Sequence, residues 1–113
     1  MKTKTKFKSI MDRQMEDPEY RRIFDQTWPA FQLEVQFLNA LEHKHWTYEH
    51  LAKIMGTKKS GISRDLKAGG LQSASMSRIA KMAHALGLKF IPFCVSEKKI
   101  KKAMPVIKEF VTV

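Results

Sequence analysis

Apolar side chains recur every three or four residues over much of this 113-residue chain, which predicts a set of amphipathic helices. The strongest pattern covers residues 30–45, and its apolar face is broad, as expected of a helix that packs on two sides. This face carries Phe31, Val35, Leu38 and Leu41, with Leu33 and Phe37 on its flanks.

Capping signals set the ends of further helices. Asp17-Pro18-Glu19 is a helix start, because Asp is a favoured N-cap and Pro is favoured at the first helical position. This helix is predicted to end or kink at Trp28-Pro29, because proline disfavours helical backbone before it. Thr47 and Ser75 are N-cap residues for two more helices. The helices predicted from these signals span residues 17–28, 48–55 and 76–86.

The stretch between Gly56 and Gly69 predicts one more, short helix. Gly56 ends the preceding helix, because glycine adopts the left-handed turn conformation without a steric penalty. Thr57 or Lys58 opens the new helix, and Ile62 and Leu66 lie four apart on its buried face. The outward-facing residues are cations and small hydroxyl donors, which suit the phosphates and base edges of DNA. These candidate DNA-binding residues are Lys58, Lys59, Ser60, Ser63, Arg64 and Lys67.

Both ends of the chain depart from this helical pattern. Leu88–Val95 is an apolar run that predicts a short strand, and Pro92 makes it an edge strand or a dimer contact. Residues 96–113 are compatible with a helix or a strand. Residues 1–16 alternate lysine with other residues and are expected to be poorly ordered without a partner. The overall expectation is an all-α fold with five helices, a short C-terminal strand and a tail.

Charge points to a polyanionic partner. The chain has 21 Lys and Arg against 11 Asp and Glu, a formal net charge of +10. A domain this basic repels itself unless it binds a polyanion such as nucleic acid. No apolar run is long enough to span a membrane, so no membrane partner is expected. The single cysteine, Cys94, excludes an intrachain disulfide and fits a reducing cytoplasm.

Catalytic and metal chemistry find no support in the residue pattern. His43 and His45 point to different faces of a helix, and no further ligands complete a four-ligand metal site. Glutamates are scattered over helix surfaces, and Cys94 has no suitably placed base. We therefore expect no enzyme, no metal and no cofactor.

Two groups of residues carry a resemblance to known families. The spacing of Gly56, Ile62-Ser63-Arg64 and Ala85-Leu86-Gly87, within residues 30–87, resembles the Cro/phage-repressor (XRE) helix-turn-helix family. The start Asp17-Pro18-Glu19-Tyr20-Arg21, together with the apolar run after Gly87, is similar to HigA-type antitoxins of toxin–antitoxin pairs. The resemblance implies a repressor-like helix-turn-helix domain whose base-reading positions are Lys59, Ser60 and Arg64. Lys58 and Lys67 then fall where phosphate contacts are common.

By the same resemblance, the expected function is sequence-specific binding of a double-stranded DNA operator. The chain would be a bacterial, cytoplasmic antitoxin and autorepressor that also neutralises a small RNA-cleaving toxin of the RelE/HigB-like class. Two alternatives stay open: a free-standing phage-type repressor without a toxin, and a protein-interaction module that binds a toxin only. High specificity for an operator usually requires two half-sites, so a homodimer is expected.

The chain is predicted to divide into three parts. Residues 1–29 form a basic arm and helix for the toxin, residues 30–87 bind DNA, and residues 88–113 contain the strand and tail for dimer contact. The candidate partner-binding residues are Phe7, Ile10, Met11, Met15, Tyr20 and Phe24. The candidate dimer residues are Phe90, Ile91 and Phe93.

Overall fold

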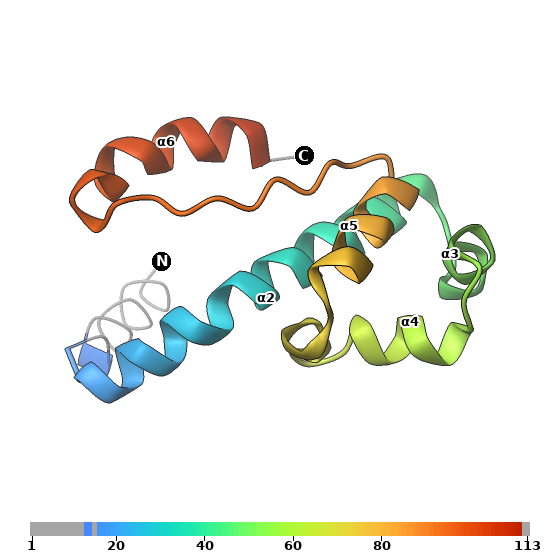
Figure 1. The fold of residues 1–113 in the computed structure, drawn as a ribbon, viewed down its shortest axis with the longest axis horizontal. Coiled ribbons are helices and arrows are strands. Elements are labelled where there is room, and N and C mark those ends of the chain that lie inside the picture. The colour runs from blue at the N-terminus through green and yellow to red at the C-terminus, as the bar shows by residue number, and fades with distance from the viewer. Residues whose placement is uncertain (1–12, 15, 112–113) are drawn as a thin grey trace, which may run out of the picture.

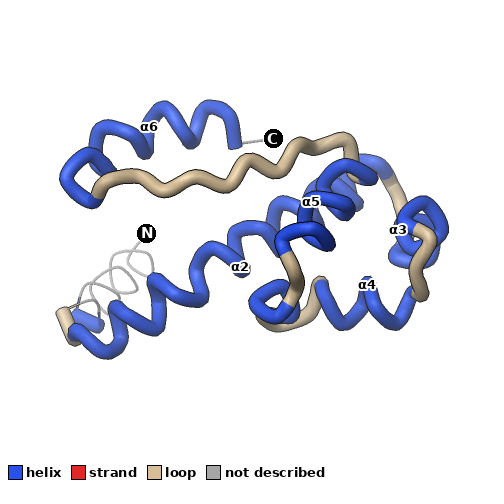
Figure 2. Tube along the Cα trace, viewed as in Figure 1, coloured by secondary structure: helices blue, strands red, loops and turns tan. Residues whose placement is uncertain are grey.

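The computed structural model describes residues 13, 14 and 16–111, and all regular elements in this part of the chain are helical (Figures 1 and 2). The all-α prediction is therefore confirmed for these residues. The α-helices are α2 (Pro18–Lys44), α3 (Tyr48–Met55), α4 (Lys59–Asp65), α5 (Met76–Ala85) and α6 (Ile100–Val111). Two short 3-10 helices, η1 (Gly70–Ser73) and η2 (Glu97–Lys99), precede α5 and α6.

The 27-residue helix α2 runs through Pro29, so the predicted helix end at Trp28-Pro29 is wrong. Its start is as predicted, because the Asp17 carboxylate accepts a hydrogen bond from the Glu19 N–H at 3.0 Å. Pro29 cannot donate to the carbonyl of the preceding turn, but it lies on the exposed side of the helix, where water can solvate that carbonyl. Aromatic contacts also bridge the site, because the Trp28 ring lies 5.1 Å from the Phe24 ring and 5.5 Å from the Phe31 ring.

One hydrophobic core joins the C-terminal half of α2 to α3, α4, η1 and α5. Its largest fully buried side chains are Phe37, Leu51, Ile62, Met82 and Leu86. The broad apolar face of α2 is only partly used: Phe37 and Leu41 are buried, whereas Phe31 and Val35 are 50% and 38% exposed. Helix α2 therefore retains an apolar side that the described chain does not cover.

The predicted caps of α3 and α5 are present. The Thr47 hydroxyl accepts from the His50 N–H and the Ser75 hydroxyl from the Arg78 N–H, each at 3.1 Å. Each cap satisfies one of the main-chain donors that a helix start leaves unpaired. Helix α4 begins differently, because its N-cap is Lys58 and no side chain caps it.

The C-terminal region contains no strand, so the prediction for Leu88–Val95 is wrong. A strand requires a second strand to accept and donate main-chain hydrogen bonds, and the described residues offer none. The segment instead runs as an extended connection alongside α2, and α6 follows it on the same side (Figure 1). The question left open for residues 96–113 is resolved for residues 100–111, which are helical and include Pro105.

Candidate nucleic-acid interface

A tight turn between α3 and α4 sets the direction of α4. Gly56 has φ +68°, a conformation that costs glycine little, and the Thr57 N–H donates to the Ala52 carbonyl at 2.9 Å. After this turn, Ile62 and Leu66 are 0% and 5% exposed, which fixes the inward side of α4. The remaining side of the helix faces away from the core.

The six candidate DNA-binding residues lie on this outward side and at the two ends of α4. Ser63 is half-buried, and the other five are exposed: Lys58, Lys59, Ser60, Arg64 and Lys67. Four of the six carry a positive charge, and between Lys58 and Lys67 the only acid is buried. The outward side of α4 therefore offers only cations, hydroxyl groups and main-chain donors, all of which pair with phosphate or base acceptors.

The buried acid is Asp65, which the sequence analysis did not single out. It is 4% exposed, and one of its carboxylate oxygens accepts a hydrogen bond from the Arg78 Nε in a charged pair. Because Arg78 belongs to α5, the pair fixes the end of α4 against α5. The spacing contained a signal for it: Asp65 follows Ile62 by three residues and so falls on the buried face, where a charge needs a partner.

Two adjacent glycines hold the other side of the α4 end. The Gly69 N–H donates to a Glu34 carboxylate oxygen of α2 at 3.3 Å. Gly70 packs so closely on α4 that a Cβ atom there would lie 2.0 Å from the Arg64 carbonyl oxygen. Only glycine fits this contact, so Gly70 allows the loop after α4 to pack against the main chain at the end of the helix.

Comparison with known proteins does not assign the chain to a family. No family model, no curated protein and no solved structure matches the chain. The resemblance to helix-turn-helix repressors and to HigA-type antitoxins therefore remains a prediction from the sequence.

The candidate partner-binding residues divide between two regions. Phe7, Ile10, Met11 and Met15 lie outside the described residues. Tyr20 and Phe24 are half-buried and belong to a row of rings along α2 that we call the aromatic ladder: Tyr20, Phe24, Trp28 and Phe31. Trp28 is 40% exposed, so the ladder presents apolar surface that runs on from the uncovered side of α2.

The candidate dimer residues also differ in their surroundings. Phe90 is half-buried and packs against the hydrophobic core, whereas Ile91 and Phe93 are 65% and 63% exposed. The structure thus gives Phe90 a role within one chain and leaves the other two side chains available for contact.

The described residues contain no cluster of three or more His, Cys, Asp or Glu side chains that would hold a metal ion. Over the same residues, none of the helices combines the length and the apolar character that crossing a membrane requires.

Proposed function

We propose that this protein binds a DNA operator sequence-specifically through α4, as the antitoxin and autorepressor of a bacterial toxin–antitoxin operon. The observation that carries the proposal is the two-sided character of α4. Ile62, Asp65 and Leu66 anchor one side in the core, and the other side presents cations and hydroxyls without an exposed acid. A short helix held this way fits the major groove, where its base-facing residues need a rigid support.

Roles for the side chains follow from their chemistry and position. Lys59, Ser60 and Arg64 contact base edges, and Arg64 pairs with the O6 and N7 atoms of a guanine. Lys58 and Lys67, at the two ends of α4, contact phosphates and set the orientation of the helix. The half-buried Ser63 is nearer the core and has room for a single hydroxyl contact.

A protein partner is favoured by the aromatic ladder. Exposed aromatic rings on a helix are typical hot spots of protein interfaces, and α4 and its support do not use them. We propose that the partner is a small RNA-cleaving toxin of the RelE/HigB-like class. The residues involved include Tyr20 and Phe24, and the proposed compartment is the bacterial cytoplasm.

The proposal includes a homodimer, because one α4 reads only a few base pairs and high specificity requires two half-sites. A monomer would have to obtain its specificity from a single half-site.

Fluorescence anisotropy with labelled duplexes tests the proposal. The protein is titrated with DNA from upstream of its own gene and with unrelated duplexes of equal length. We expect tighter binding to the upstream DNA, and we expect Arg64→Ala to weaken it by about 1–3 kcal/mol and to relax specificity at one base pair. Arg22→Ala, an exposed arginine in α2, is the matched control and is expected to bind like the parent. Equal affinity for all duplexes, or an Arg64→Ala variant that binds like the parent, would refute specific binding through α4.

A further inference from the structure

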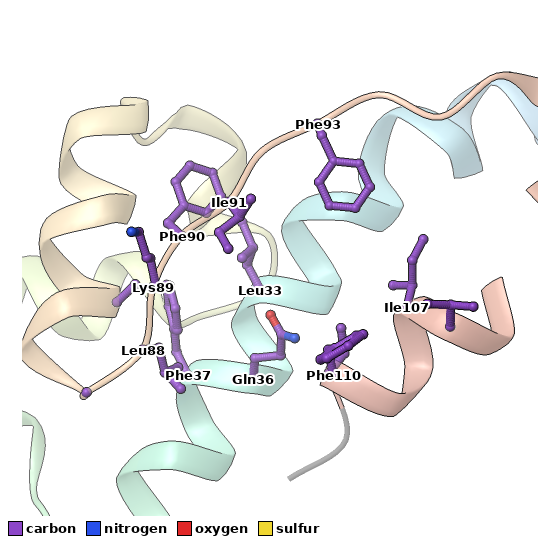
Figure 3. A pocket seen from close by; sticks show the side chains of 14 residues that line it. Leu33, Gln36, Phe37, Leu88, Lys89, Phe90, Ile91, Phe93, Ile107 and Phe110 are labelled. Atoms are coloured by element: carbon purple, nitrogen blue, oxygen red, sulfur yellow. The ribbon is translucent and has the colours of Figure 1, made fainter. Parts of the chain in front are cut away.

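A groove of about 680 Å³ lies between the core and α6 (Figure 3). One wall consists of Leu33 and Phe37 of α2 together with the extended segment 88–93, and the other wall is α6 with Ile107 and Phe110. Among the described residues that line it, only Gln36 and Lys89 have polar side chains. The groove is therefore almost wholly apolar.

Helix α6 does not close this groove within its own chain. No residue of α6 is buried, and Phe110 is 83% exposed although it lines the groove. Val106, one turn earlier, is 56% exposed. Helix α6 directs Ile107 and Phe110 towards the groove (Figure 3). Ala103, Met104 and Ile107 are partly buried, but none of the apolar side chains of α6 is fully buried.

The area of exposed apolar surface around the groove can be compared with the area that a specific dimer interface buries. It comes from Ile91, Phe93, Val106, Phe110 and Val111, which are between 41% and 83% exposed. With fully exposed side chains on the order of 150–200 Å², these five offer roughly 500 Å² per chain. Two such surfaces bury roughly 1,000 Å² together, which reaches the lower limit for a specific interface before any polar rim is counted. An apolar patch of this size is among the largest that a typical monomer exposes, and such patches are often functional.

We infer that the occupant of the groove is a second copy of this chain, whose α6 lies across it and inserts Phe110. A two-fold interface uses the same patch on both subunits, so each copy supplies the apolar helix and the groove that receives it. The exposed apolar area favours a second copy of the chain as the occupant, because one two-fold contact covers the groove and α6 of both chains. Figure 1 shows segment 88–95 and α6 on one side of α2 and α4 on the other, so the contact leaves both α4 helices free.

This inference deepens the proposed function and rests on it for the need of two α4 helices, but its test contains no DNA. Sedimentation velocity of the full chain, over a concentration series up to tens of micromolar, measures the mass. We expect a species of twice the 13.1 kDa chain mass at the upper concentrations. Phe93→Ser and Phe110→Ser are each expected to raise the dimer dissociation constant at least about 100-fold, because each removes apolar area from both halves of the interface.

The matched control is Phe31→Ser, which removes a half-exposed phenylalanine on α2 that does not line the groove. It is expected to leave the dissociation constant unchanged. Because Phe93 and Phe110 are exposed in the single chain, their variants should fold, and thermal unfolding by circular dichroism checks this. Hydrogen exchange gives a second readout, with the amides of α6 expected to be more protected in concentrated than in dilute solution.

Two results would overturn the inference. One is a chain that stays monomeric throughout the series. The other is a dimer that Phe93→Ser and Phe110→Ser do not weaken, or that Phe31→Ser weakens as much as they do. A monomer that still prefers its operator would refute this inference and the homodimer of the proposed function, but not operator binding through α4. A groove-dependent dimer without sequence preference would refute operator binding and leave this inference standing.

Discussion

The pairing of Asp65 with Arg78 allows a prediction that separates the two partners. Asp65 is almost completely buried, with a side chain 6% exposed, whereas the Arg78 side chain is 29% exposed. Removing the arginine therefore leaves a buried carboxylate without its partner, and removing both partners leaves no buried charge. We expect Arg78→Leu to lower the free energy of unfolding more than the double substitution Asp65→Ala/Arg78→Leu does.

The magnitude follows from the burial. Breaking a fully buried ion pair on one side costs about 3–5 kcal/mol. Because water already reaches Arg78, we expect the free energy of unfolding of Arg78→Leu to fall by about 2–3 kcal/mol. The double variant should recover at least about 1 kcal/mol of that loss.

Urea unfolding followed by circular dichroism at neutral pH measures both variants against the parent. The m-value checks that the same surface is exposed on unfolding in each case. An Arg78→Leu variant within about 0.5 kcal/mol of the parent, or a double variant no more stable than the single one, would refute the reasoning.

Two further predictions concern the support of α4 and the aromatic ladder. Gly70→Ala places a Cβ 2.0 Å from a main-chain carbonyl oxygen of α4, so we expect urea unfolding to show a loss of at least about 3 kcal/mol. The control Gly87→Ala, at φ +78° but with no atom nearer than 3.6 Å, is expected to cost about 1–2 kcal/mol, and similar losses for the two would contradict the packing argument. If the proposed toxin is the product of the neighbouring gene, Trp28→Ala is expected to weaken co-purification of that product, whereas Ile54→Ala, similarly exposed on α3, is not. Equal capture by both variants would place the toxin site away from the ladder.

Local signals in the sequence predicted several helix starts and one helix end correctly. Asp17, Thr47 and Ser75 cap helices through their own side-chain oxygens, and Gly56 adopts the left-handed turn. Each of these depends on contacts within a few residues, which a linear pattern contains. The outward side of α4 was also predicted correctly. Because Ile62 and Leu66 are buried, the cations of α4 must face solvent.

The features that the sequence did not predict depend on distant residues or on missing partners. Helix α2 continues through Pro29, which is exposed to solvent and is flanked by the ring contacts of Trp28 with Phe24 and Phe31. The local preference against helix before proline does not take these contacts into account. The run Leu88–Val95 has the composition of a strand, but composition cannot supply the second strand. Asp65 and Arg78 are thirteen residues apart, and the contact of Gly70 with α4 requires the loop to have folded back.

The salt dependence of DNA binding tests the central claim, contact of α4 with DNA, most directly. If a dimer contacts about four to six phosphates, the logarithm of affinity should fall against the logarithm of salt concentration with a slope near −4 to −5. Lys67→Ala removes one of these contacts per chain, so the slope should become shallower by about one unit per chain, while Lys102→Ala, an exposed lysine of α6, should leave it unchanged. A flat salt response, or an equal change of slope for Lys67→Ala and Lys102→Ala, would contradict binding through α4.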